Sequence, residues 1–167
     1  MKSTVYLSLG ANLGDREANL EEAVTRLGGL GTVTAVSALY ETEPVEVADQ
    51  QPWYLNAVVA METGLAPKDF LDLVLATEHA MGRRRTGAKS PRTVDIDILL
   101  FGDRVIEEPG ITIPHPRIQQ RRFVLEPLVD IAPDAVHPVL KLTVKELLAG
   151  LPPAAGTVKK ITSPREV

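Results

Sequence analysis

The sequence contains no cysteine, which excludes disulfide bonds, thiolate nucleophiles and cysteine-ligated zinc. This absence suits a reducing compartment, so we expect a cytoplasmic protein. Long apolar runs are also missing. No segment approaches the roughly 18 apolar residues of a membrane span, and the apolar run near the start is too short for a signal peptide. The 18 basic residues are outnumbered by 22 acidic ones, a balance that argues against a general nucleic-acid binder.

The chain does contain enough apolar material for one folded unit. With 167 residues, of which 44% are hydrophobic, it can bury a sizeable core without disulfides or structural metals. We therefore expect a single domain over residues 1–167 that acts as a monomer. The residues beyond 151 are predicted to form a weakly structured tail.

The spacing of apolar residues switches repeatedly between strand and helix periods. Strand patterns occupy residues 4–9, 33–40, 55–61 and the stretch 91–101, whereas residues 15–27 and 67–82 carry apolar side chains at helical spacing. Residues 10–15 supply turn residues and a helix cap. The order β-α-β-β-α-β predicts an α+β, ferredoxin-like fold, an antiparallel sheet with helices on one face. The other face would stay free for ligands. A C-terminal extension follows, with a short helix near residues 144–148.

The stretch of residues 91–101, PRTVDIDILLF, places two carboxylates in an apolar, β-branched run. In a strand, Asp95 and Asp97 share a face, and at about 3.3 Å per residue their Cα atoms lie roughly 6.6 Å apart. Two carboxylates that close repel each other unless a cation lies between them, so the pair indicates a divalent metal site. The alternative is the solvated face of a half-buried strand. However, Asp is depleted in strands, and Leu99 and Phe101 would continue the same face as apolar residues.

Other residues around this strand are candidates for binding. Arginines and lysines cluster within residues 83–92 and 117–122, although a charge cluster is usually a solvated surface. His115 lies between two prolines beside the second cluster, but a lone histidine is more often structural. Glu78 lies beside the apolar stripe of the second helix, where a carboxylate is costly unless it has a partner. A structural ion pair with an arginine is the alternative to a binding role.

The tetrapeptide WYLN at residues 53–56 could stack a planar ring and read its hydrogen-bonding edge. Together with the acidic pair and the cationic clusters, it provides what phosphoryl transfer to a small planar acceptor requires.

Residues 91–97, PRTVDID, resemble the P-R-x-x-D-[LIV]-D signature of the 6-hydroxymethyl-7,8-dihydropterin pyrophosphokinases. The resemblance extends over residues 3–150 and includes GANLG at 10–14, YETEP at 40–44 and YLN at 54–56. It departs from the family where Lys89-Ser90 replaces a frequent Trp-Gly. The resemblance implies transfer of pyrophosphate from ATP to the pterin hydroxymethyl oxygen with release of AMP, a step of folate biosynthesis. It also implies a ferredoxin-like fold and two magnesium ions.

By the same resemblance, individual residues acquire expected roles. Asp95 and Asp97 would hold both metal ions and, with Arg83 and Arg92, form the catalytic set. The residues expected to bind ATP are Glu78, Arg83, Arg85, Arg92, Ile98, Thr112, His115 and Arg121. The residues expected to line the pterin pocket are Thr42, Pro44, Val45, Tyr54, Asn56 and Phe123. We expect no nucleic acid and no membrane among the partners.

Two other classes of function use comparable features. Metal-dependent nucleotidyl transfer or nucleic-acid cleavage also uses paired aspartates on such sheets, and salt-dependent binding of DNA or RNA would favour it. A regulatory module that binds a small ligand at its sheet needs no aspartate pair, and magnesium-independent binding without turnover would favour that reading.

Overall fold

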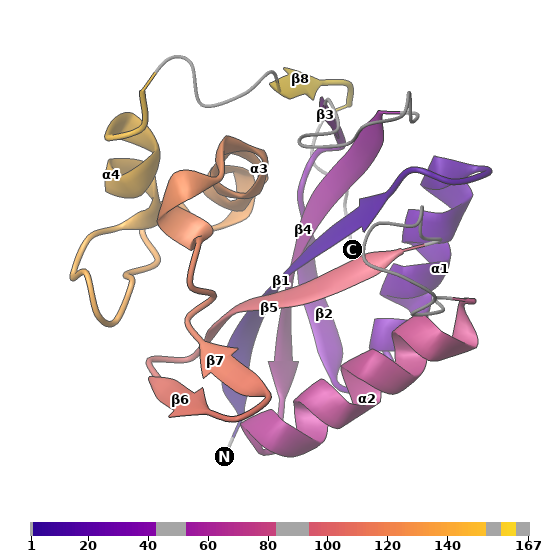
Figure 1. Ribbon diagram of the computed structural model, residues 1–167, viewed down its shortest axis with the longest axis horizontal. Helices are drawn as coiled ribbons and strands as arrows, with labels where there is room; N and C mark the ends of the chain where they lie inside the picture. Colours follow the sequence, from indigo (N-terminus) through magenta and orange to yellow (C-terminus); the bar gives the residue numbers. More distant parts are fainter. Residues whose placement is uncertain (1, 43–52, 83–93, 153–157, 163–167) are drawn as a thin grey trace.

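The computed structural model describes residues 2–42, 53–82, 94–152 and 158–162, which form an antiparallel sheet with helices on both faces (Figure 1). The strands are β1 (Ser3–Ala11), β2 (Thr32–Val36), β3 (Tyr40–Thr42), β4 (Tyr54–Thr63), β5 (Asp95–Phe101), β6 (Ile106–Glu108), β7 (Ile111–Ile113) and β8 (Val158–Lys160). The helices are α1 (Arg16–Leu27), α2 (Pro67–Ala80), α3 (Arg122–Ile131) and α4 (Val144–Ala149), with a 3-10 helix at Ile118–Gln120. None of the helices in the described residues is both long and apolar enough to cross a membrane.

The sheet has the strand order β5-β1-β4-β3-β8, and β2 also pairs with β4. All of these pairings are antiparallel, and β6 and β7 form a separate hairpin. The predicted ferredoxin-like α+β fold is confirmed. The single strand expected over residues 33–40 is instead split into β2 and β3. The break occurs at the buried Ser37, whose hydroxyl accepts a hydrogen bond from Val58 N (2.8 Å) and donates to the Ala38 carbonyl oxygen (2.8 Å).

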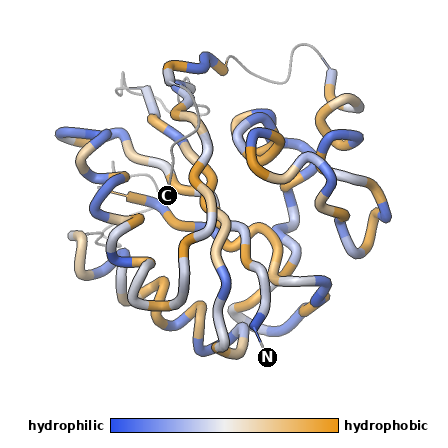
Figure 2. Tube along the Cα trace, turned by 180° about the vertical axis from the view of Figure 1, so that it is seen from behind, coloured by the Kyte–Doolittle hydropathy of each residue, from blue (hydrophilic) through white to orange (hydrophobic). Residues whose placement is uncertain are grey.

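Helices α1 and α2 pack on one side of the sheet, which we call the first face. Val5, Leu7 and Leu9 of β1 point toward these helices and are fully buried. The predicted cap of α1 is confirmed, because the Asp15 side chain accepts a hydrogen bond from Ala18 N (3.0 Å). Hydrophilic and hydrophobic residues alternate along the helices (Figure 2), as expected when one side of each helix contacts the core.

The opposite side of the sheet, the second face, is partly covered by α3 and α4 (Figure 1). Val58 and Leu99 of the sheet pack there against Leu125 and Leu128 of α3. The expectation that this whole face would stay free was therefore wrong. The sequence did not predict α3, because Pro127 lies inside the helix and no side chain caps its first turn. Burial of its apolar side outweighs both defects.

A polar contact also fixes α3 on the sheet. Asp130 accepts hydrogen bonds from the Tyr40 hydroxyl (2.7 Å) and from Ala38 N (3.3 Å), and Lys160 of β8 lies 3.7 Å from its other carboxylate oxygen. Burial and the nearby Asp130 carboxylate raise the pKa of Tyr40, so the phenol stays protonated and donates. β8 itself lies within the tail that was expected to be weakly structured. Within this tail, Val158–Lys160 pair with β3.

Strand β5 contains a β-bulge that the alternation pattern did not reveal. Tyr6 pairs with Leu100 whereas Leu7 pairs with Ile98, so Leu99 is the extra residue. The bulge reverses the alternation, and Phe101 packs on the first face against Phe70, with 5.7 Å between ring centroids. Leu99 does share the second face with the acidic pair, as predicted, but Phe101 does not.

The loop between α3 and α4 depends on a neutral histidine. The buried His137 accepts hydrogen bonds at Nδ1 from Val139 N (3.2 Å) and Leu140 N (3.0 Å). Burial lowers the pKa of His137, since the charged imidazolium is poorly solvated there. An imidazolium would also have to give up both accepted bonds.

We predict that His137→Asn reduces the loss of stability in mild acid. The wild-type unfolded state takes up a proton near pH 6.5 while folded His137 does not, so the free energy of unfolding falls as the pH drops below about 6.5. Asn keeps an acceptor oxygen in place of Nδ1 but does not titrate. Urea unfolding between about pH 7.5 and 5.5 should show a shallower decline for the variant. His79→Asn, at an exposed position of α2, is the matched control, and parallel profiles for all three proteins would contradict the prediction.

Candidate active site

The register of three central strands brings the acidic pair and an amide onto the same face. β1 lies between β5 and β4, and its Gly10 pairs with Asp95 on one side and Asn56 on the other. Directly paired residues project their side chains to the same face, here the second face. At about 4.8 Å between neighbouring strands, the backbones at Asp95 and Asn56 lie about 10 Å apart. Asp97, paired with Ser8, lies on this face as well.

The acidic pair stands on a firmly held strand. The side chains of Ile96 and Ile98 are buried on the first face, whereas Asp95 is half-buried and Asp97 is exposed. The fully buried Glu78 of α2 accepts a hydrogen bond from Ile96 N (2.7 Å), the amide between the two aspartates. This contact gives Glu78 a structural partner that is a backbone amide. The structure thus anchors β5 from its core side while the carboxylates face outward.

The donor set fits magnesium better than a metal that is held by protein alone. Within the described ranges, no group of three or more His, Cys, Asp or Glu side chains is arranged to hold a metal ion. Asp95 and Asp97 provide two carboxylates on one face. Magnesium usually takes one or two carboxylates and completes its shell with water and substrate phosphates. The pair is therefore suited to magnesium that arrives with a phosphate-bearing substrate.

His115 lies close enough to Asp97 and Arg121 to be influenced by their charges. Its backbone N donates to the Leu99 carbonyl oxygen (3.0 Å), which places it beside β5. Burial lowers the pKa of His115 most, Arg121 and Arg117 lower it further, and Asp97 raises it. Nδ1 accepts a hydrogen bond from Arg117 N (3.2 Å), so the neutral ring carries its proton on Nε2. The ring can thus donate one hydrogen bond to an oxygen ligand.

Arg121 and Phe123 lie at the start of α3. The Arg121 guanidinium carbon is 5.5 Å from the centroid of the Phe123 ring, a cation–π distance. Phe123 is partly buried and packs against the apolar cluster between α3 and the second face of the sheet. The start of α3 therefore contributes a cation close enough to His115 to affect its pKa, and a flat aromatic surface beside that cation.

A compact polar group lies on the same face of the sheet, across β1 from the acidic pair. Asn56 Nδ2 donates to Thr42 Oγ1 (2.6 Å), and both side chains are buried. Tyr54, one step along β4 on this face, is half-buried and pairs with Thr42. A Cβ atom on Gly10 would lie 3.0 Å from Asn56 Oδ1 and 3.8 Å from Tyr54 Cδ1. Gly10 therefore leaves room for the amide and the ring.

The remaining predicted residues lie elsewhere or outside the described residues. The side chain of Ile98 is buried in the first-face core, so it could reach a nucleotide through its backbone but not through its side chain. Thr112 is exposed on the β6–β7 hairpin. The other expected residues, Pro44, Val45, Arg83, Arg85 and Arg92, fall outside the residues that the structure describes.

Sequence reasoning missed the part that Gly10 plays. Gly10 was read as a turn residue, but β1 continues to Ala11. The pairing of β1 with two neighbouring strands extends β1 past residue 9. Because Gly10 has no side chain, the Asn56 side chain fits beside it on the second face. The strand alternation of residues 4–9 could have been extended by two residues, but the glycine concealed it.

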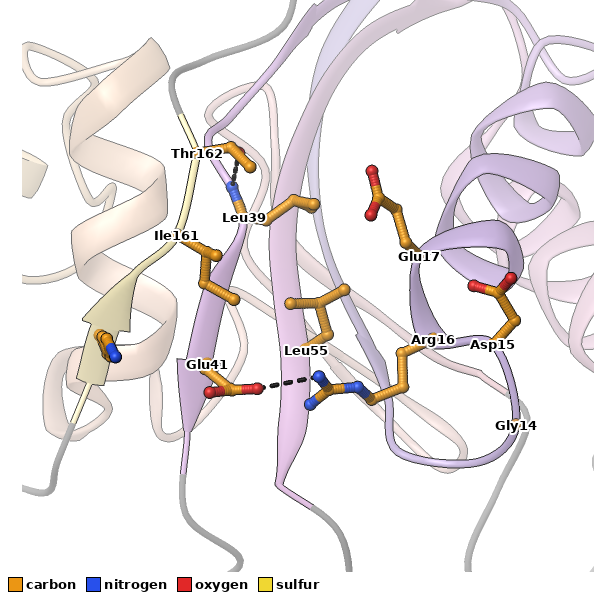
Figure 3. Close-up of a pocket in the computed structure, with 10 residues that line it drawn as sticks. Gly14, Asp15, Arg16, Glu17, Leu39, Glu41, Leu55, Ile161 and Thr162 are labelled. Carbon is orange, nitrogen blue, oxygen red and sulfur yellow. Dashed lines mark hydrogen bonds and ion pairs between the residues drawn. The ribbon is translucent and has the colours of Figure 1, made fainter.

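The structure also contains a cavity of about 450 Å³ that lies away from the acidic pair. It is formed by the first turn of α1, β3, β4 and the residues next to β8 (Figure 3). Leu55 and Glu41 line it, and these residues project to the first face. This cavity is separate from the candidate site on the second face.

The fold and the acidic pair define the class of the protein, a ferredoxin-like α+β domain with two aspartates on the open part of its sheet. Residues 6–133 match the family model described as 7,8-dihydro-6-hydroxymethylpterin-pyrophosphokinase (HPPK). The chain belongs to this family. The predicted family, and the enzyme class that its name states, are confirmed.

Several relatives have names in agreement. The chain is 44% identical over 133 residues to the 2-amino-4-hydroxy-6-hydroxymethyldihydropteridine pyrophosphokinase of Bacillus subtilis, covering 78% of this chain and 79% of that one. It is 42% identical over 154 residues to the enzyme of the same name from Pseudomonas aeruginosa, covering 91% and 94%. It is also 42% identical over 149 residues to the folic acid synthesis protein fol1 of Schizosaccharomyces pombe, covering 88% of this chain. The match spans 20% of that longer protein.

A solved structure supports the fold independently. The HPPK-DHPS protein of Plasmodium falciparum superposes with a TM-score of 0.72 at 18% identity, covering 89% of this chain and 44% of that one.

We predict that Gly10→Ala displaces the Asn56 amide and destabilises the fold. The added Cβ would press on Asn56 Oδ1, and crowding of this kind costs roughly 1–3 kcal/mol of unfolding free energy. Chemical denaturation would measure the loss, and NMR shifts of the Asn56 side-chain amide would report its displacement. Gly64→Ala is the matched control, because a Cβ there meets nothing within 4 Å. An unchanged Asn56 signal with full stability would refute the crowding argument.

Proposed function

We propose that the protein transfers pyrophosphate from ATP to 6-hydroxymethyl-7,8-dihydropterin, giving AMP and the pterin diphosphate in folate biosynthesis. Given that the chain belongs to this family, one structural observation supports the proposal most directly. The register of β1 sets Asp95 and Asn56 on one face, about 10 Å apart. That separation leaves room for a triphosphate on the acidic side and a planar ring on the amide side.

The acidic pair is the proposed holder of two magnesium ions. Bound there with the triphosphate, magnesium would neutralise charge on the phosphate oxygens. Asp95 and Asp97 would hold the magnesium ions in a fixed position, because β5 is itself held by Glu78 and by the first-face core. We propose this indirect role for Glu78, which the sequence had associated with the nucleotide.

His115 and Arg121 are the proposed phosphate ligands from the described residues. The Nε2 proton of His115 would donate to a phosphate oxygen, and Arg121 would compensate its negative charge. We propose that Arg83, Arg85 and Arg92 bind the same group, with Arg83 and Arg92 acting in catalysis. Backbone groups near Ile98 and Thr112 would contact the nucleotide.

The pterin is proposed to bind where Asn56, Thr42 and Tyr54 meet. Asn56 already donates one hydrogen bond to Thr42, which orients its amide for the hydrogen-bonding edge of the ring. Tyr54 and Phe123 would contact the two flat surfaces of the ring, and Pro44 and Val45 would complete the pocket.

In the proposed step, the pterin hydroxyl oxygen attacks the β-phosphorus in line. A bond forms between this oxygen and the β-phosphorus, and the bond from the β-phosphorus to the bridging oxygen of AMP breaks. The bridging oxygen leaves with AMP, and the hydroxyl proton passes to solvent. The protein forms no covalent intermediate. Its contribution is alignment of the two substrates and stabilisation of charge.

We expect the purified protein to produce AMP from MgATP when 6-hydroxymethyl-7,8-dihydropterin is present. Chromatography of the adenine nucleotides, with a control that lacks the pterin, would measure the product. Pterin-dependent ADP would instead mean transfer of a single phosphoryl group. Absence of nucleotide turnover by folded protein with magnesium would overturn the proposal.

We predict that Asp97→Asn lowers kcat on the order of a thousandfold, because about 4 kcal/mol of transition-state stabilisation depends on the lost charge. The exposed position of Asp97 should leave the free energy of unfolding nearly unchanged. Asp103→Asn, at an exposed acid just beyond β5, is the matched control and should retain activity. Steady-state kinetics with urea unfolding would test both statements, and near-normal turnover of Asp97→Asn would remove the metal assignment.

A further inference from the structure

Arg16, the first residue of α1, joins two strand ends that are far apart in sequence. Its Nη1 donates to the Trp53 carbonyl oxygen (2.8 Å), and its Nη2 donates to Glu41 Oε2 (2.8 Å). Figure 3 shows the guanidinium directed at Glu41 across the cavity on the first face. Glu41 belongs to β3 and Trp53 immediately precedes β4, so one guanidinium binds both strands where their pairing ends.

The residues next to these two contacts form the polar group on the second face. Glu41 is followed by Thr42 and Trp53 is followed by Tyr54, and Thr42 pairs with Tyr54 as the last pair of the β3–β4 ladder. Because side chains alternate along a strand, Glu41 projects to the first face and Thr42 to the second. Arg16 thus holds, from the first face, the residues next to the pocket residues, whose side chains lie on the second face.

The last pair of a short ladder needs such support. β3 has three residues, and its pairing with β4 covers three pairs. The ends of secondary structure open at low free energy unless other contacts hold them. Arg16 provides a charge-assisted contact to each strand, and its side chain and that of Glu41 are 29% and 27% exposed. The helix that carries it is anchored by the buried Leu20, Ala23 and Leu27.

We propose that Arg16 is a positioning residue for the pterin pocket: by binding both Glu41 and the Trp53 carbonyl oxygen, it sets the spacing of Thr42, Tyr54 and Asn56. This inference rests on the proposed function. It assigns to the start of α1 a part in recognition of the planar substrate, although Arg16 does not face that substrate. The residues proposed to hold metal and phosphate lie on β5 and at the start of α3, so binding of MgATP should be insensitive to Arg16.

The test is Arg16→Gln, with equilibrium binding measured separately for two ligands. We expect the dissociation constant of 6-hydroxymethyl-7,8-dihydropterin, measured by calorimetry with magnesium and a non-hydrolysable ATP analogue present, to rise about tenfold. The dissociation constant of that ATP analogue with magnesium, and kcat at saturating pterin, should stay within about twofold. Arg16→Lys keeps a cation opposite Glu41 but lacks the guanidinium fork, and it should recover part of the lost affinity.

Arg26→Gln is the matched control on the same helix. Arg26 makes an exposed ion pair with Glu22 (2.8 Å) that touches neither strand, so its loss should leave both ligands unaffected. If the wild-type protein makes no pterin-dependent AMP, the proposed function fails and the inference falls with it. If the wild type is active, two results overturn the inference alone. One is pterin affinity in Arg16→Gln equal to the wild-type value, and the other is an equal loss of affinity for both ligands.

Discussion

The pairing of β1 with both β4 and β5 is the constraint on which the site depends. It places Asp95, Gly10 and Asn56 in one row across the sheet. A slip of one residue would turn the carboxylates toward the α1–α2 core, because side chains alternate with a period of two. Ile96 and Ile98 of β5 oppose that slip, since both are buried on the first face beside Val5, Leu7 and Leu9 and their exposure to water would be unfavourable. The register that fills the core is also the one that assembles the site.

The second face is divided between the packing of α3 and α4 and the candidate site. Leu125 and Leu128 of α3 cover the part of the sheet around Val58 and Leu99 and leave the acidic pair outside that cluster. Apolar burial is non-directional, so it does not by itself fix how α3 lies on the sheet. The hydrogen bond from Tyr40 to Asp130 is directional and sets that arrangement. α3 consequently starts beside the site, and Arg121 and Phe123 lie at its margin.

Much of the fold followed from local patterns, because α1, α2 and the central strands have strong periods and recognisable ends. What failed depended on contacts distant in sequence. Ser37 splits a predicted strand by bonding to β4, an extra residue in β5 moves Phe101 to the first face, and α3 forms despite Pro127. The site shows the same division. The aspartate pair is a local signal, but the approach of Asn56 to it depends on strand order, which residue spacing does not specify. The family resemblance supplied that link.

Three helices bind the sheet through its backbone next to the site. Arg16 of α1 bonds to the Trp53 carbonyl oxygen, Glu78 of α2 to Ile96 N, and Asp130 of α3 to Ala38 N. Each contact uses a charged side chain on a main-chain group, and such bonds are stronger than those between neutral partners. A helix held by apolar contacts alone can shift along a sheet at small cost, whereas a broken bond of this kind leaves a polar group without its partner. One contact lies on β5, which carries the aspartates, and the other two lie just before the strands that carry Asn56 and Tyr40. The proposed alignment of two substrates requires strands that do not shift relative to one another, and these three contacts act against that movement.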